Sequence, residues 1–232
     1  PKPSSAASDV YKRQSIMRST HQDEQRYLLL DNRIIEDTEK TELMLGTVEK
    51  HPSNPLFGED KPWEARFDNL YANIIYDNEE NLYKCWYSPF IVDNSALGMS
   101  LDERRQRYWA PENREMALCY ATSLDGIVWE KPELGLVEFE GTKANNILWR
   151  GEVRREDQAK KVWRGPHGTG VFKDLREPDP NRRYKALLKS NILSIAYSKD
   201  GIHWDPAIAC PEADSAGDTH NNALWSDDLE KY

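Results

Sequence analysis

The sequence predicts an all-β protein built from repeated four-stranded units, and three observations lead to this prediction. Aromatic residues are frequent, with 8 Trp and 11 Tyr among 232 residues, and such side chains suit pleated, half-buried strands. A strand–turn–strand pattern recurs along the chain. An Asp-Gly turn motif also follows two of these hairpins at an equivalent position. Four antiparallel strands per repeat is the size of a β-propeller blade.

The hairpin pattern consists of an apolar run, an acidic turn and an aromatic-rich run, which is typical of two antiparallel strands. It is found at Asn73–Asp77 with Leu82–Tyr87, at Gly170–Asp174 with Arg183–Leu188, and at Asn222–Asp227 with Glu230–Tyr232. Each occurrence is therefore expected to form a hairpin with a polar turn.

The turn motif reads Ser-x-Asp-Gly-x-x-Trp and is found at Ser123–Trp129 and again at Ser198–Trp204. Glycine tolerates the positive φ that a tight turn requires. We expect the Ser to bond the turn backbone and the Trp to pack after the turn, so these residues are interpreted as structural. The sequence contains two such units and the start of a third, which predicts a propeller truncated to roughly two and a half blades.

Three regions are expected along the chain. Residues 1–14 resemble a translated sequencing adapter of the kind found in metagenomic fragments, and this artefactual leader is set aside from the fold. Residues 15–62 are expected to supply short N-terminal strands, at Tyr27–Ile35 and Leu43–Val48, and a proline-rich connector. Residues 63–232 are expected to form the incomplete propeller.

Composition excludes several classes of function. A formal net charge of −9 argues against broad nucleic-acid binding, which needs a basic surface. The sequence has no apolar run of about 18 residues, so no membrane span is expected. The cysteines, Cys85, Cys119 and Cys210, have neither metal-ligand spacing nor a disulfide pattern. Cys85 and Cys119 lie in apolar runs and are expected to be buried free thiols.

Several of these motifs together suggest a family. They are the two Ser-x-Asp-Gly-x-x-Trp turns, the Asn-x-x-Tyr-Asp hairpin at Asn73, and the opening segments Leu28–Glu36 and Glu49–Pro52. Over about residues 27–232 the chain resembles the propeller superfamily of glycoside hydrolase families 32 and 43. The resemblance implies a five-bladed β-propeller that hydrolyses O-glycosyl bonds of an oligo- or polysaccharide without a cofactor. It also leads us to expect a periplasmic or secreted location.

The resemblance implies that catalytic acids precede the innermost strand of each blade. Asp68 and Asp218 hold the first- and third-blade positions, with Asp68 as base or nucleophile and Asp218 as general acid. The second-blade position, where the superfamily usually has an Asp, holds His167. We expect His167 to orient the substrate.

Other residues near these positions are candidates for substrate binding. His220 is expected to bind a sugar hydroxyl, and aromatic rings to stack on sugar faces. The candidates are Asn69, Tyr71, Trp109 and His220. The histidines and Asp218 lack a tight ligand spacing, so no metal is expected. Glu64 is a weaker alternative acid, whereas Asp174 and Glu177 lie in the turn at the opposite end of a hairpin and are not expected to be catalytic.

Two further interpretations remain open besides hydrolysis. The missing second-blade acid favours a non-catalytic carbohydrate-binding propeller. A glycoside phosphorylase would need a basic phosphate pocket, which the Arg-rich insertion at 98–114 would supply. A sialidase is disfavoured, because its turn motif has one more residue between Asp and Gly and because no arginine trio is recognisable.

Overall fold

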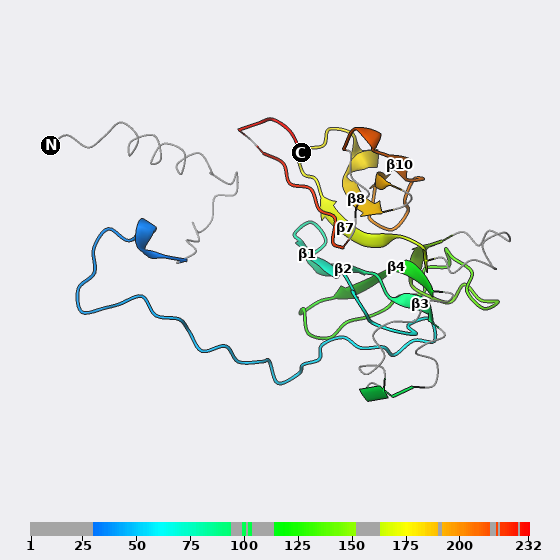
Figure 1. Ribbon diagram of the computed structural model, residues 1–232, viewed down its shortest axis with the longest axis horizontal. Coiled ribbons are helices and arrows are strands. Elements are labelled where there is room, and N and C mark those ends of the chain that lie inside the picture. Colours follow the sequence, from blue (N-terminus) through cyan, green and yellow to red (C-terminus); the bar gives the residue numbers. More distant parts are fainter. Residues whose placement is uncertain are drawn as a thin grey trace. The chain divides into compact units, whose positions relative to one another are not determined.

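The computed structural model (Figure 1) describes residues 30–93, 99–100, 102–103, 114–151, 163–189, 192–213, 217, 219–226 and 228–232. The chain divides into two compact units, Pro1–Lys50 and His51–Tyr232. The described residues form mainly antiparallel sheets with almost no helix, which confirms the all-β prediction. In this part of the chain, no helix has the length and apolar character needed to cross a bilayer.

The N-terminal part of the chain, Pro1–Lys50, differs from the expectation where it is described. The strand predicted at Tyr27–Ile35 is, in its described part, a 3-10 turn, η1 (Asn32–Ile34), where the Asp31 side chain accepts a hydrogen bond from the Arg33 backbone N–H. The strand predicted at Leu43–Val48 is not formed either. The prediction at Leu43–Val48 was wrong, and so was the described part of the first, residues 30–35. Alternation alone does not make a strand, which needs a partner for its backbone groups. The apolar side chains of the latter segment are largely exposed instead.

The first sheet contains six strands and lies within His51–Tyr232. They are β1 (Asn73–Asp77), β2 (Leu82–Tyr87), β3 (Phe90–Asp93), β4 (Arg114–Ser123), β5 (Ile147–Arg150) and β6 (Trp163–Arg164). The central path runs β1-β2-β4-β3, while β5 pairs with β4 antiparallel and β6 pairs with β4 in parallel. The β1–β2 pairing confirms the first predicted hairpin.

The second sheet is a four-stranded antiparallel sheet of order β10-β9-β8-β7. Its strands are β7 (His167–Lys173), β8 (Tyr184–Lys189), β9 (Leu193–Ser198) and β10 (Ile208–Ala209). The β7–β8 pairing confirms the second hairpin, whereas the described part of the third shows a single bridge, between Ser226 and Lys231. The described residues form two sheets, fewer than the four or more blades of a closed propeller, so a complete propeller is not part of this structure.

The two predicted turns have the same hydrogen bonds. Ser123 Oγ accepts from the backbone N–H of Gly126 at 2.8 Å, and Asp125 Oδ1 accepts from the next two backbone N–H groups. The Trp129 indole then donates to the Gly126 carbonyl at 3.2 Å. Each of these bonds recurs at the equivalent positions of Ser198–Trp204. The structural interpretation of the motif is therefore confirmed.

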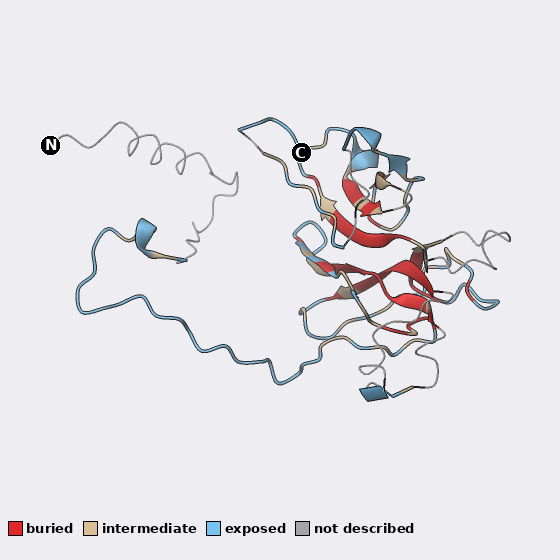
Figure 2. Cartoon of the chain, viewed as in Figure 1, coloured by how far each residue is buried: buried red, intermediate tan, exposed pale blue. Residues whose placement is uncertain are grey.

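Apolar side chains pack on both faces of the first sheet, and buried residues follow β2, β4 and β7 in Figure 2. One cluster lies between the sheets and contains Trp86, Leu118, Tyr120, Leu148, Val171, Tyr184, Ala186, Leu188 and Ala196. The other cluster, against which Phe57 and Phe67 pack from the segment before β1, contains Trp63, Cys85, Tyr87, Ile91, Ala117, Cys119, Ala121, Phe139 and Ile147. Cys85 and Cys119 are buried free thiols, as predicted.

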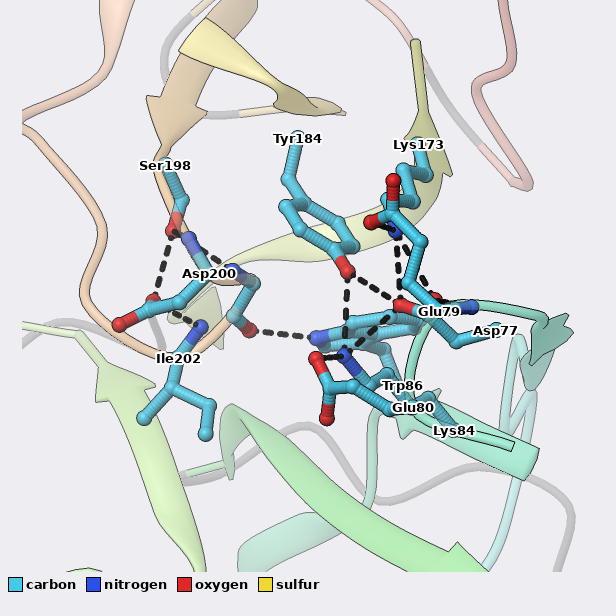
Figure 3. A network of polar contacts seen from close by, with 11 residues as sticks. Asp77, Glu79, Glu80, Lys84, Trp86, Lys173, Tyr184, Ser198, Asp200 and Ile202 are labelled. Carbon is cyan, nitrogen blue, oxygen red and sulfur yellow. Dashed lines mark hydrogen bonds and ion pairs between the residues drawn. The ribbon is translucent and has the colours of Figure 1, made fainter. Parts of the chain in front are cut away.

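A polar network joins the two sheets through Asp77 at the end of β1. Figure 3 shows Lys84, Lys173 and Tyr184 converging on the Asp77 carboxylate, with distances of 2.8–3.0 Å. These donors hold the pKa of Asp77 well below its usual range even though burial opposes them. Nearby, the Trp86 indole donates to the Gly201 carbonyl at 2.7 Å.

The contact of Asp77 with a lysine and a tyrosine recurs in the next repeat. Asp174 directly follows β7, much as Asp77 is the last residue of β1, and it binds Lys185 and the Tyr232 hydroxyl. Lys185 also approaches the Tyr232 hydroxyl at 3.1 Å, as Lys84 approaches that of Tyr184. Each Asp–Lys pair therefore binds the Tyr of the following unit.

Candidate functional site

The segments that lead into the first strand of each unit carry most of the candidate site residues. These segments are Asp68–Tyr71 before β1, His167 at the start of β7, and Thr219–Asn221 at the start of the third unit. Trp109 and Asp218 lie outside the described residues.

The buried amide of Asn73 joins all three segments. Its Nδ2 donates to the carbonyl of Tyr71 at 2.8 Å and to that of Thr169 at 2.9 Å. Its Oδ1 lies 3.0 Å from the Val171 backbone nitrogen and 2.9 Å from His220 Nε2. The third unit is also tied to the second, because Asn221 forms a parallel bridge with Thr169. Asn73 thus ties the starts of the three repeats to one another.

Three rings meet beside this amide, and we call Tyr71, His167 and His220 the mouth cluster. The Tyr71 ring lies perpendicular to that of His167, with centroids 5.4 Å apart, and 5.9 Å from that of His220. Tyr71 and Asn69 both have left-handed backbones, with φ of 49° and 54°. Such conformations are uncommon for residues other than glycine and are frequent at functional sites.

The two histidines of the mouth cluster are held differently. Because the Asn73 oxygen can only accept, His220 Nε2 carries the hydrogen of their bond. His220 is exposed as a whole residue, but partial burial of its ring lowers the pKa of the imidazole and favours the neutral form. His167 is buried, with Nδ1 3.3 Å from Met116 Sδ. His220 therefore keeps a neutral imidazole more readily than a free histidine does.

Asp68 belongs to a second group, the arginine–aspartate cluster of Arg66, Asp68, Asp93 and Arg114. Arg66 Nη2 lies 3.2 Å from Asp68, and Arg66 Nη1 lies 3.6 Å from Asp93. Arg114 Nη2 lies 3.2 Å from the same Asp93 oxygen. Asp93 and Arg114 are directly opposite each other where β3 ends and β4 begins. Strand register therefore places two of the three buried members of this cluster, Asp93 and Arg114.

A short path of contacts links the arginine–aspartate cluster to the mouth cluster. The Arg114 guanidinium lies 4.8 Å from the Phe90 ring centroid, and Phe90 is paired with Met116 across β3 and β4. Met116 in turn contacts His167. Asp68 forms an ion pair with Arg66. The structure thus brings Tyr71, His167 and His220 together and places Asp68 beside Arg66.

Sequence reasoning missed four residues of this region: Arg66, Asn73, Asp93 and Arg114. Asn73 opens the hairpin motif, so its repeated position was a usable signal. Arg114 closes the Arg-rich insertion, but nothing in the sequence distinguishes it from its neighbours. Arg66 and Asp93 come together only because Arg66 forms a β-bridge with Phe90, in the strand β3 that Asp93 ends. The described residues contain no group of three or more His, Cys, Asp and Glu side chains placed to hold a metal ion.

Glu64, the weaker alternative acid, has a structural environment. Its side chain is fully buried, accepts from the Tyr87 hydroxyl at 2.7 Å and from Lys131 at 2.8 Å, and also accepts from the Asp60 backbone N–H. Lys131 itself lies 4.3 Å from the Phe57 ring centroid. These bonds fasten the connector to the first sheet.

Comparison with known proteins adds no family. No protein-family model matches the sequence, and no curated protein is significantly similar to it.

Proposed function

We propose that the two sheets are consecutive blades of a β-propeller and that the mouth cluster lies at its substrate-binding end. Repetition supports the proposal: the same Ser-Asp-Gly-Trp turn follows β4 in the first sheet and β9 in the second, and both sheets use an Asp–Lys pair to bind the Tyr of the next repeat. Repeats that each contact their neighbour are typical of propellers and solenoids. The resemblance to the family 32 and 43 superfamily favours the propeller.

The proposed activity is hydrolysis of an oligo- or polysaccharide. The observation that carries it is the meeting of Tyr71, His167 and His220, which come from three successive units, around Asn73. A tyrosine face can stack on a sugar ring, and imidazoles can bind hydroxyls. Asn69 and Trp109 are proposed as further contacts to the sugar.

Catalysis is assigned to Asp68 and Asp218. Asp68 is the proposed base or nucleophile, and its side chain is 24% exposed, which leaves it within reach of a ligand. Asp218 is the proposed general acid, and His167 orients the substrate. A pair of carboxylates on either side of the scissile bond is what glycoside hydrolysis requires.

A carbohydrate-binding propeller without catalysis is the second candidate. One observation favours it: the second-blade position has a buried His167 packed on Met116, and no carboxylate. A phosphorylase remains the third candidate, since its phosphate pocket would come from the Arg-rich insertion.

A hydrolysis screen of the purified chain on oligo- and polysaccharides, with and without inorganic phosphate, tests this proposal. We expect product without phosphate, lost in Asp68→Asn and Asp218→Asn, while sugar binding by Asp218→Asn is retained. Unchanged turnover in Asp218→Asn would remove Asp218 from the mechanism. Product that depends on phosphate would establish the phosphorylase, and binding without any product would establish the binding module.

A further inference from the structure

The imidazole of His220 is held through one of its two ring nitrogens. Nε2 lies 2.9 Å from Asn73 Oδ1, and among the residues that the structure describes Nδ1 has no hydrogen-bond or ion-pair partner. His220 is an exposed residue. Its second ring nitrogen is therefore left for a molecule from solution.

The amide of Asn73 decides which of these nitrogens carries the hydrogen. Its Nδ2 donates to the backbone carbonyls of Tyr71 and Thr169, at 2.8 and 2.9 Å. Its Oδ1 accepts from the Val171 backbone N–H at 3.0 Å. These bonds fix the orientation of the amide, because the reverse orientation would place its oxygen against two carbonyl oxygens. Asn73 therefore presents an acceptor to His220, and Nε2 must donate.

The chemistry of the free nitrogen follows from this bond. Partial burial of the ring lowers the pKa of His220 and favours the neutral imidazole, which has one N–H and one nitrogen with a lone pair. With its hydrogen on Nε2, neutral His220 has the lone pair on Nδ1. The group that binds at Nδ1 must therefore be a hydrogen-bond donor, such as a hydroxyl.

A second exposed histidine of the chain is held in the opposite way. His203 Nδ1 lies 2.8 Å from Asp200 Oδ2. A carboxylate can only accept, so His203 carries a hydrogen on Nδ1 and, when neutral, has its lone pair on Nε2. The two histidines are therefore a matched pair with opposite tautomers, and His203 is a control for His220.

The ring of Tyr71 lies beside that of His220. Their centroids are 5.9 Å apart, with an angle of 48° between the ring planes, and Tyr71 is partly exposed. An aromatic ring offers an apolar face to a ligand, whereas the imidazole offers a single acceptor. A sugar has both complementary features, an apolar ring face and hydroxyls around its rim.

We propose that Asn73 is a positioning residue that fixes the ring of His220, and that His220 accepts a hydrogen bond at Nδ1 from a hydroxyl of the bound carbohydrate. The second part rests on the proposed carbohydrate site, whereas the fixed tautomer does not. The proposal gives His220 a binding role and leaves proton transfer to the carboxylates.

Nitrogen-15 NMR of the histidine rings in the full chain tests both parts. At a pH above the titration of the histidines, we expect a protonated Nε2 and an unprotonated Nδ1 for His220, and the reverse for His203. The probes are xylo-, arabino- and fructo-oligosaccharides. On binding, the Nδ1 resonance of His220 should move upfield while its tautomer stays the same. A protonated Nδ1 in the free protein would overturn the role of Asn73, and an unmoved Nδ1 resonance in the saturated complex would overturn that of His220.

Two substitutions separate the two ring nitrogens. His220→Gln keeps an N–H donor toward Asn73 and removes the acceptor, whereas His220→Asn keeps an oxygen near the position of Nδ1 and gives up the bond to Asn73. His220→Gln should unfold at the wild-type temperature yet bind the oligosaccharide roughly 10-fold more weakly. His220→Asn should unfold at a lower temperature and retain more of the binding, and His203→Gln should bind as wild type does. Wild-type binding by His220→Gln would overturn the acceptor role.

Fluorinated probes identify the hydroxyl. Replacing single hydroxyls of the tightest-binding oligosaccharide by fluorine removes one donor at a time. One such derivative should bind wild type about 10-fold more weakly than the parent sugar, and His220→Gln should bind both equally. The same loss in both proteins for every derivative would show that His220 does not bind a hydroxyl. If no oligosaccharide binds, the proposed function and the ligand role of His220 both fail, while the tautomer of the free protein still decides the role of Asn73.

Discussion

At the scale of single residues, Asn73 is the side chain on which the candidate site depends. Its amide bonds two carbonyls, one backbone N–H and one imidazole, and these groups come from all three repeat units. Buried polar groups need hydrogen-bond partners, and Asn73 provides them for backbone groups of two repeats. One side chain therefore fixes the relative position of the starts of the three repeats.

Replacing Asn73 should therefore be costly. We expect Asn73→Ala to lower the free energy of unfolding by about 2–4 kcal/mol, because it leaves buried backbone groups without partners. Urea unfolding followed by tryptophan fluorescence measures the change. Asn78→Ala, at an exposed turn position, is the control and should stay within about 0.5 kcal/mol of wild type. Equal effects of the two substitutions would contradict the role of Asn73.

At the scale of elements, the two Ser-Asp-Gly-Trp turns are alike in sequence and hydrogen bonding but differ in their neighbours. Gly126 and Gly201 both have positive φ, of 74° and 79°. A Cβ on Gly126 would be in ordinary contact with Tyr83 at 3.6 Å, whereas one on Gly201 would lie 2.6 Å from Trp86. Only the second turn is therefore packed tightly against the other sheet.

This difference predicts unequal effects of the same substitution. Gly126→Ala should cost about 1–2 kcal/mol, the backbone penalty of a left-handed alanine. Gly201→Ala should cost about 1–3 kcal/mol more, because the methyl group displaces Trp86 and its bond to the Gly201 carbonyl. Denaturant midpoints of the two variants give the comparison. A Gly201→Ala protein as stable as Gly126→Ala would show that the sheets do not pack closely there.

The elements that the sequence predicts well are local ones. The hairpins at Asn73–Tyr87 and Gly170–Leu188 and both turns follow from alternation, turn chemistry and repetition within a few residues. Strands β3, β5 and β6 were not predicted, since they form only by pairing with the ten-residue β4 from distant parts of the chain. The strand expected at Leu43–Val48 is not formed. Alternation within one segment predicts a strand but says nothing about a partner strand for it to pair with.

At the scale of the whole molecule, the contact between the two sheets is electrostatic as well as apolar. Asp77 of the first sheet, buried among Lys84, Lys173 and Tyr184, has a pKa held well below its unfolded value. Its contribution to stability is therefore fully present above the unfolded pKa of about 3.9 and is lost as pH falls further.

Asp77→Asn should thus lower the free energy of unfolding near pH 7 by about 1–3 kcal/mol, since it removes the carboxylate shared by the buried Lys84 and the partly buried Lys173, which keep only Glu80 and Glu79 as acidic partners. The gap from wild type should narrow as pH falls from about 5 toward 3, because wild type then loses the same interaction. Urea titrations across this range measure it. Asp228→Asn, at an exposed position, is the control, and its free energy of unfolding should stay within about 0.5 kcal/mol of wild type throughout the titration. A constant gap for Asp77→Asn would contradict this account of the interface.

The candidate site could be predicted from the sequence only in part. Tyr71, His167 and His220 were found because the repeats align the starts of the units, and the structure brings them together. Arg114 and Asp93 could not be found, because their meeting depends on the register of β3 against β4. The repeated Asp–Lys–Tyr contact was visible in principle, since Asp77 and Lys84 recur as Asp174 and Lys185, but only the structure shows that the Tyr comes from the next unit.

The central claim is that the mouth cluster binds a carbohydrate, and histidine NMR tests it most directly. The imidazole Cε1–H signals of the full chain are followed during titration with the neutral oligosaccharide that binds most tightly. The account predicts that the signals of His167 and His220 shift together with one dissociation constant. Those of His51 and His203, which are exposed and lie outside the cluster, should not move. Shifts at His51 or His203 with none at His167 and His220 would contradict the claim.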